Sequence, residues 1–143
     1  MGKKRIIKKG GSGSESGTSR ALQRIPKKKV AIGSLYILAT FNNTIVTLCD
    51  TKGNSLISAS SGTLGFKGSR KSTPFAAAKV GEIIGDKALQ MGMKDANVVI
   101  RGIGAGRESA LRAFAGKGIN VTRIADETPV PHNGPRPPKE RRV

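Results

Sequence analysis

The sequence predicts a single α/β domain, a mixed β-sheet of about five strands with two helices, flanked by basic, extended arms at both ends. Three short apolar runs separated by turn residues come first, and a strand, helix, strand pattern follows, which is typical of parallel strands joined by a right-handed crossover. Residues 30–127 suffice for one small domain. Residues 1–29 and 128–143 hold too few apolar side chains for a core of their own, and we expect residues 1–29 to be disordered until they bind a partner.

The first half of the domain is expected to be an antiparallel meander. Residues 31–40, 44–49 and 55–60 are rich in Ile, Leu, Val and small residues and predict its three strands. Asn42 and Asn43 form the turn between the first two strands, and an Asp, Gly and Asn cluster provides the turn before the third.

After residue 72 the spacing of the apolar residues changes and predicts a helix. Thr73 supplies a capping hydroxyl, Pro74 stands at the first helical position, and Gly92 ends the helix. One face of this helix carries apolar residues at three- and four-residue spacing, namely Ala77, Val80, Ile84, Ala88 and Met91.

A strand, a helix and a strand complete the predicted domain. Residues 97–101 form a short buried strand, residues 107–115 a helix that Gly116 and Gly118 end, and residues 119–125 the last strand. The sequence shows no internal repeat.

The charge of the chain predicts a polyanionic partner. Its 26 Lys and Arg residues outweigh 9 Asp and Glu residues and give a net charge of +17. Residues 1–29 carry ten cations and one acid, so the charge is concentrated toward the ends. Nucleic acid fits this pattern better than a membrane surface, because no apolar run approaches the roughly 20 residues of a membrane span and no basic amphipathic helix is visible.

Cys49 is the only cysteine and His132 the only histidine. A disulfide within the chain and a zinc site are therefore not expected, and we predict no metal or other cofactor. A reducing, cytoplasmic compartment is the default for such a chain. Cys49 lies in an apolar run and is interpreted as a small buried hydrophobic residue.

The last sixteen residues, TPVPHNGPRPPKERRV, predict an extended arm, because five prolines remove backbone donors and prevent a helix or a central strand. A stiff, positive arm is suited to lying along a polyanion. A solvated, disordered terminus is the alternative. The arm carries one acid, Glu140, and four cations: Arg136, Lys139, Arg141 and Arg142.

The loop of residues 62–72, GTLGFKGSRKS, lies between a predicted strand and a predicted helix, where a nucleotide-binding P-loop would lie. Arg70 stands where that motif requires its second glycine, so nucleotide hydrolysis is disfavoured. Lys67, Arg70 and Lys71 on a flexible backbone beside a helix N-terminus predict instead a site for RNA phosphates.

The loop of residues 102–108, GIGAGRE, resembles a dinucleotide-binding fingerprint, with Asp126 about twenty residues beyond it. Arg107 occupies the position of the third glycine, and the chain is too short for a second nucleotide-binding half. We interpret the glycines as a tight turn that presents Arg107 to phosphate, and a turn without any ligand remains open.

A two-metal nuclease is a further alternative, since carboxylates stand on different elements of the predicted sheet. Nothing in the sequence pairs these carboxylates, and each has an ordinary structural explanation in a turn or on a solvated helix face. They are Asp50, Glu82 or Asp86, and Asp126.

Four segments together resemble the ribosomal protein S11 family of the small subunit, in its bacterial type. They are TFNNTIVT from residue 40, GFKGSRKSTPFAA from residue 65, GRESALRA from residue 106, and the proline-rich tail. The resemblance covers roughly residues 24–143. Pro135, Glu140 and Ile103 depart from the residues usual in the family, which bears on the details of the tail contacts.

This resemblance implies a binding protein without catalysis or a small-molecule substrate, located in the ribosome of the cytoplasm. It implies a three-layer fold like that of ribonuclease H, on the platform of the 30S subunit, where the family bridges segments of 16S rRNA near the messenger exit and the Shine-Dalgarno duplex. Ribosomal proteins S7 and S18 are the implied neighbours, with initiation factor three nearby.

We expect lysines to act as point charges and arginines to bind phosphates through bidentate hydrogen bonds from the guanidinium group. His132 and Asn133 are candidates for contacts with unpaired bases, and the low aromatic content argues against a stacking platform. The predicted RNA-binding residues are Lys27, Lys28, Lys29, Asn42, Asn43, Lys67, Arg70, Lys71, Arg107, His132, Asn133, Arg136, Lys139, Arg141 and Arg142.

Asn133 precedes Gly134, which has no side chain to hinder attack of its amide nitrogen on the asparagine carbonyl. Isoaspartate formation at Asn133 is therefore expected if this segment is mobile. An RNA chaperone or regulatory RNA binder that works away from the ribosome is the main functional alternative.

Overall fold

The computed structural model describes residues 27–139, in which strands and helices follow one another in the predicted order. Residues 1–26 and 140–143 lie outside the described residues, and with them most of the predicted N-terminal arm, Glu140, Arg141 and Arg142. The elements are β1 (Ile32–Ala39), β2 (Thr44–Asp50), β3 (Ser55–Ser60), the short 3-10 helix η1 (Gly68–Ser72), α2 (Pro74–Gln90), β4 (Asp95–Arg101), α3 (Gly106–Ala115) and β5 (Asn120–Asp126).

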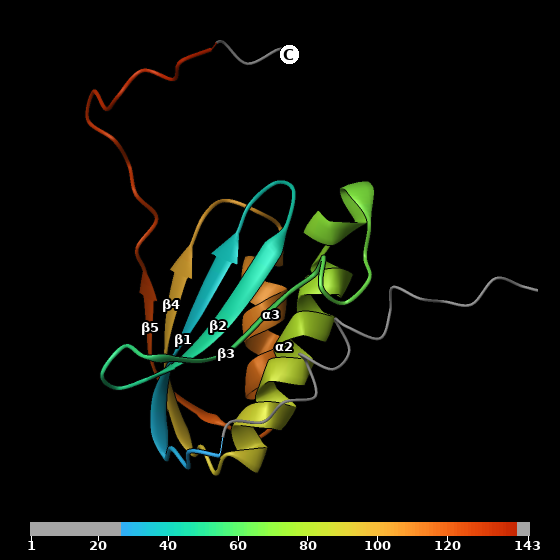
Figure 1. Ribbon diagram of the computed structural model, residues 1–143, viewed down its shortest axis with the longest axis vertical. Coiled ribbons are helices and arrows are strands. Elements are labelled where there is room, and N and C mark those ends of the chain that lie inside the picture. The colour runs from blue at the N-terminus through green and yellow to red at the C-terminus, as the bar shows by residue number, and fades with distance from the viewer. Residues whose placement is uncertain (1–26, 140–143) are drawn as a thin grey trace, which may run out of the picture.

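The five strands form one mixed sheet in the order β3-β2-β1-β4-β5 (Figure 1). β2 pairs antiparallel with β1 and β3, whereas β4 pairs parallel with β1 and β5. Leu35 in the central strand is paired with Leu48 of β2 and Val98 of β4, so a row of apolar side chains crosses the middle of the sheet. The predicted meander, the mixed sheet and the parallel crossover are confirmed.

Thr73 and Gly92 mark the ends of α2 as predicted. The Thr73 hydroxyl accepts a hydrogen bond from the backbone N–H of Ala76 at 3.3 Å, which satisfies one of the free amides of the first turn. Gly92 follows the helix with φ of 80°, a conformation that glycine adopts without strain. The short helix η1 was not predicted, because its residues carry no apolar periodicity.

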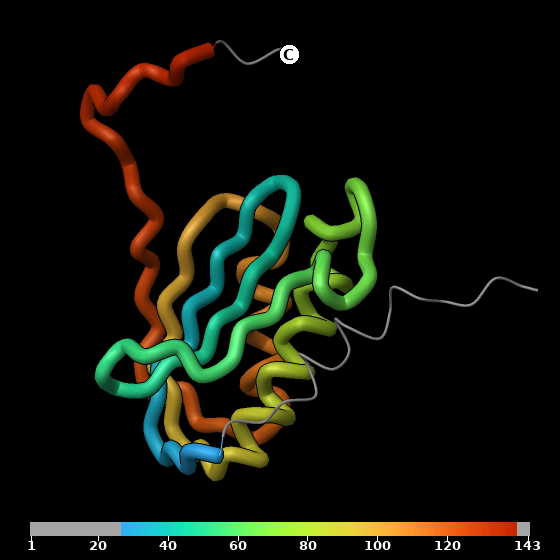
Figure 2. The backbone as a smooth tube through the Cα atoms, viewed as in Figure 1, coloured from blue at the N-terminus to red at the C-terminus, as the bar shows by residue number. Residues whose placement is uncertain are grey.

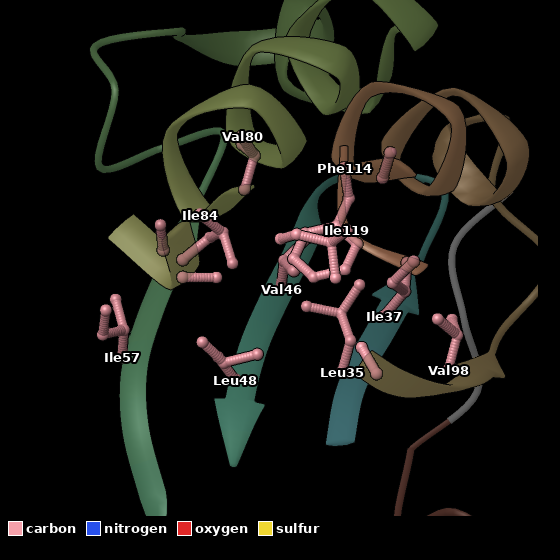
Figure 3. Packing of buried hydrophobic residues seen from close by; sticks show 14 of the residues in the cluster. Leu35, Ile37, Val46, Leu48, Ile57, Val80, Ile84, Val98, Phe114 and Ile119 are labelled. Carbon is pink, nitrogen blue, oxygen red and sulfur yellow. The ribbon is translucent and has the colours of Figure 1, made fainter. Parts of the chain in front are cut away.

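Both α-helices cover the same face of the sheet (Figure 1). Strand residues such as Leu35, Ile37 and Val46 point toward Ile84 of α2 and Phe114 of α3, and all five side chains are at most 1% exposed (Figure 3). Burial of these apolar surfaces is the main stabilisation of the domain, at about 25 cal/mol per Å².

The opposite face of the sheet is not covered by any helix of the described residues. Tyr36 and Leu38 of β1 point to this face and are 37% and 41% exposed. The five-strand α/β fold class is therefore confirmed, but residues 27–139 form two layers where the family resemblance implied three. The connections β3–α2–β4 and β4–α3–β5 both cross the sheet in the direction from β3 to β5. Because both crossovers are right-handed, their helices lie on the same face of the sheet.

Candidate nucleic-acid interface

Several of the predicted RNA-binding segments meet at one end of the domain. β1, β4 and β5 are parallel, so the segments that follow them leave the sheet at the same edge. Figure 2 shows the turn of residues 40–43, the loop of residues 61–73 and the loop of residues 102–105 at this edge, and the tail leaves β5 from the same end. We call this end the carboxyl edge of the sheet.

The loop of residues 62–72 presents cations beside the N-terminus of α2. Lys67 and Arg70 are exposed and Lys71 is half-buried, and within the described residues none of the three forms an ion pair. The loop is held locally, since the Thr73 hydroxyl donates a hydrogen bond of 2.7 Å to the carbonyl oxygen of Arg70. This arrangement leaves the positive side chains available to an anionic ligand.

The loop of residues 102–105 packs so closely against the end of β1 that two of its positions require glycine. A Cβ atom on Gly102 would lie 2.1 Å from the carbonyl oxygen of Ala39, and one on Gly104 would lie 2.3 Å from that of Thr40. The Gly104 N–H also donates a hydrogen bond of 2.9 Å to the Ala39 carbonyl. These contacts agree with a tight turn, the interpretation that needs no ligand.

Arg107 contacts the glycine loop, the end of β5 and the start of the tail. Its guanidinium donates hydrogen bonds to the carbonyl oxygen of Gly102, to the Asp126 carboxylate and, at 3.4 Å, to the Thr128 hydroxyl. Gly102 in turn donates its N–H to the Thr128 hydroxyl at 3.2 Å. Contact of Arg107 with phosphate stays a prediction, and the observed geometry gives the side chain a positioning role at the same edge.

The Asp126 carboxylate is kept ionised by this arrangement. Hydrogen bonds from the Thr128 hydroxyl and from Arg107 lower the pKa of Asp126 to about 2. The anion at the end of β5 therefore neutralises Arg107 over the whole ordinary pH range.

Lys27, Lys28 and Lys29 lie at the opposite end of the domain, just before β1 (Figure 1). All three lysines are exposed, and Lys28 pairs with Asp50 through an Nζ to Oδ2 distance of 2.8 Å. Lys28, the Asn54 side chain and the backbone N–H groups of Asn54 and Lys52 all donate hydrogen bonds to Asp50. Together they hold the pKa of Asp50 well below its usual range, and the Lys28 contact contributes most. Sequence reasoning missed the role of Lys28 in securing this turn.

The two asparagines of the β1–β2 turn differ in their surroundings. The Asn43 side chain accepts a hydrogen bond of 2.9 Å from the Thr44 N–H and so stabilises the turn. Asn42 is exposed, and its backbone N–H donates to the Thr40 hydroxyl at 3.4 Å. Asn42 is thus the more available of the two for an RNA contact.

Residues 127–139 contain no helix or strand and run away from the end of β5 (Figure 2). His132, Asn133, Arg136 and Lys139 are all exposed, and Asn133 has a φ of 59°, which is uncommon outside glycine. Arg141 and Arg142 lie outside the described residues.

The carboxylates of the nuclease alternative are separated and engaged with cations. Asp50 pairs with Lys28, Glu82 with Lys79, Asp86 with Lys117, and Asp126 with Arg107. Among residues 27–139 no group of three or more His, Cys, Asp or Glu side chains is arranged to hold a metal ion.

Cys49 is 6% exposed, and burial raises the pKa of its thiol, so its interpretation as a buried hydrophobic residue is confirmed. In the part of the chain that the structure describes, no helix is long and apolar enough to cross a membrane.

Aromatic residues at the carboxyl edge were missed by sequence reasoning. Phe41 is 67% exposed in the β1–β2 turn, and Phe75 is 65% exposed in the first turn of α2. Phe41 directly precedes Asn42 and Asn43, and Phe75 closely follows the basic loop of residues 62–72. Their position beside these predicted RNA-binding segments is the signal that could have identified them.

Comparison with known proteins points to one family. A family model described as "Ribosomal protein S11" matches residues 33–142. The protein "Small ribosomal subunit protein uS11" of Paraburkholderia xenovorans (strain LB400) is 52% identical over 130 residues, which cover 91% of this chain and 97% of the relative. The protein of the same name from Polynucleobacter asymbioticus (strain DSM 18221 / CIP 109841 / QLW-P1DMWA-1) is 53% identical over 130 residues, covering 91% of this chain and 96% of the relative.

Proposed function

Because the chain belongs to the ribosomal protein S11 family and is a structural constituent of the small ribosomal subunit, we propose that it binds and bridges separate helices of 16S rRNA. Proteins of this family are structural and have no enzymatic activity. The chain works in translation as part of a ribonucleoprotein.

The observation that carries this proposal is the set of unpaired cations at the carboxyl edge. Lys67, Arg70 and Lys71 lie on one loop, and Arg136 and Lys139 lie on the extended tail that leaves the same edge. None of these side chains is neutralised by an acid within the described residues. Phosphates are the ligands that such a surface favours.

Bridging is supported by the second group of cations. Lys27 and Lys29 are exposed at the end of the domain opposite to the carboxyl edge, with the whole length of β1 between the two groups. One RNA helix at each end would neutralise both groups, and the rigid sheet would fix the spacing of the two helices. Arg141 and Arg142 extend the predicted contacts of the tail.

Recognition by shape and by the phosphate backbone is the expected mode. Aromatic residues make up only 3% of the chain, and the open face of the sheet carries one aromatic side chain, Tyr36, among its described residues. A stacking platform needs several exposed rings on its sheet. His132, Asn133 and Asn42 provide the few hydrogen-bonding groups available for unpaired bases.

The family resemblance supports a more detailed placement. We propose that the chain lies on the platform of the 30S subunit near the messenger exit and the Shine-Dalgarno region of the mRNA. Ribosomal proteins S7 and S18 are its proposed neighbours, and initiation factor three binds nearby. The ribosome of the cytoplasm is its proposed location.

The salt dependence of binding to purified 16S rRNA tests the electrostatic part of the proposal. If about six phosphates are neutralised, log K against log salt concentration has a slope of about −4 to −5. A slope near zero would overturn this account.

Sedimentation separates the proposal from an RNA chaperone that acts away from the ribosome. The structural role predicts that the chain migrates quantitatively with the 30S particle in a sucrose gradient. A large pool of the chain outside ribosomal particles would favour the chaperone.

A further inference from the structure

We propose that an apolar groove between the loop of residues 62–72 and α2 holds one unstacked RNA base, with the neighbouring phosphates on the cations of that loop. The groove is lined by Leu64, Phe66, Phe75, Lys79 and Ile83. This inference rests on the proposed function, because it names the RNA feature that the carboxyl edge would recognise.

The walls of the groove are built for a flat, apolar ligand. The rings of Phe66 and Phe75 meet edge to face, with 6.1 Å between their centroids and an angle of 83° between their planes. Phe75 remains 65% exposed although it lies in this aromatic pair. The groove has a volume of about 340 Å³, within the range of small-ligand sites.

Elements on both sides hold the groove in place. Phe75 is the second residue of α2, where the Thr73 cap and Pro74 fix the start of the helix. Ile83 lies two turns further along α2, and Leu64 packs against the hydrophobic core. The groove is therefore preformed, and a ligand would bind without ordering a loop first.

The charges around the groove favour an anionic partner. Lys79 Nζ lies 5.7 Å from the centroid of the Phe75 ring, and its charge is paired with Glu82 at 3.0 Å, so the free positive charge comes from the loop. Lys67, Arg70 and Lys71 belong to the same loop as Phe66 and have no acidic partner among the described residues. A nucleotide combines a flat apolar base with an anionic phosphate, and aromatic side chains bind unstacked bases in this way.

Replacing Phe75 tests the stacking contact. We expect Phe75→Ala to weaken binding of the full chain to purified 16S rRNA about 5- to 160-fold, the range that corresponds to loss of one stacked base. The slope of log K against log salt should stay that of the wild type, because no cation is removed. Phe75→Leu keeps an apolar side chain without a ring, so its affinity for 16S rRNA should lie between those of the wild type and Phe75→Ala.

Two control variants separate stacking from other effects. Lys67→Gln should lower the magnitude of the salt slope by somewhat less than one, as loss of one phosphate contact requires. Leu89→Ala, at the far end of the same helix where Leu89 is 43% exposed, should bind as the wild type does. Thermal unfolding of each variant shows whether the fold is intact.

Ultraviolet cross-linking gives the direct readout. Irradiation of subunits assembled with the full chain should yield a nucleotide adduct on Phe75 or Phe66, identified by mass spectrometry. If Phe75→Ala binds 16S rRNA as tightly as the wild type and no adduct forms on either ring, the inference is wrong.

The outcomes also distinguish this inference from the function on which it rests. A wild-type chain that fails to bind 16S rRNA would overturn the proposed function itself. A Phe75→Ala variant that binds RNA normally but is not retained in 30S particles would show that a ribosomal protein, not a base, fills the groove.

Discussion

Arg107 illustrates how one residue can link two segments that are distant in the sequence. Its guanidinium joins the Gly102 carbonyl at the end of β4 to Asp126 and Thr128 at the start of the tail. The side chain is 30% exposed, so its ion pair is only partly screened by water. The position of the tail relative to the glycine loop thus depends on contacts that a sequence pattern does not reveal.

The titration of Asp126 provides a test of this linkage. The pKa of Asp126 is about 2 in the folded chain and 3.8 for an unperturbed side chain. Because the folded value is the lower one, the ionised carboxylate stabilises the fold above about pH 4, and this contribution is lost as the pH falls through about 2. The melting temperature of Asp126→Asn should therefore lie below that of the wild type at neutral pH, and the gap should close between about pH 4 and pH 2. A gap that is independent of pH would contradict the assigned role.

Asn133 is expected to form isoaspartate. It is exposed, precedes Gly134 and has a φ of 59°. We expect isoaspartate to accumulate at Asn133 when the isolated chain is aged at neutral pH, as measured by peptide mapping. Gly134→Ala should slow the reaction because the added methyl group hinders the attacking nitrogen. Detection of intact Asn133 alone in the aged chain would count against this prediction.

At the scale of the elements, the two helices pack closely against each other. A Cβ atom on Gly81 of α2 would lie 2.4 Å from the carbonyl oxygen of Ala110 in α3. The helices therefore approach each other more closely than any larger residue at position 81 allows. The atom that the Cβ would meet belongs to the backbone of a packed helix, which cannot move aside as a flexible side chain can.

Substitution at position 81 should separate the helices. We expect Gly81→Ala to lower the free energy of unfolding by about 1–3 kcal/mol, despite the higher helix propensity of alanine. Urea denaturation monitored by circular dichroism measures the change. Gly62→Ala is the matched control, since the nearest atom to its Cβ would be 3.5 Å away, and its effect should stay within about 0.5 kcal/mol. Equal stability of both variants would contradict the packing argument.

The elements of this fold could largely be predicted because their signals are local. Thr73, Pro74 and Gly92 determine the ends of α2 through contacts within a few residues, and the meander follows from short apolar runs and turn residues. The start of β4 was expected at residue 97 but lies at Asp95, because pairing with β1 extends the strand through Asp95 and Ala96.

The parts that sequence reasoning missed depend on contacts between distant residues. Nothing near Arg107 in the sequence shows that Asp126 will lie beside it, and nothing near Lys28 identifies Asp50 as its partner. The number of layers likewise depends on the direction of both connections through a helix. The cations of the loop at 62–72 could be predicted as a group because they are close in the sequence, whereas the groove beside them requires the packing of α2.

For the whole molecule, the distribution of charge is the property that matters for assembly. The chain carries a net charge of +17. Exposed cations lie at both ends of the sheet, with Lys27 and Lys29 before β1 and Lys67 and Arg70 at the carboxyl edge, and the core holds the sheet rigid. A single RNA helix along one end would leave the other cations unneutralised, at a cost in self-repulsion. The chain is therefore expected to contact RNA at two separate places.

Two double variants with the same loss of charge test this bridging directly. Lys27→Gln with Lys29→Gln removes the cations before β1, and Lys67→Gln with Arg70→Gln removes those at the carboxyl edge. Each pair should reduce the magnitude of the salt slope by about 1.4 to 1.8, as loss of two phosphate contacts requires. Hydroxyl-radical footprinting of 16S rRNA should then show that the two variants lose protection at different RNA helices. If both variants lose protection at the same RNA helix, the chain contacts one RNA segment and does not bridge two. Cations that contact different RNA helices should give different footprints when they are removed.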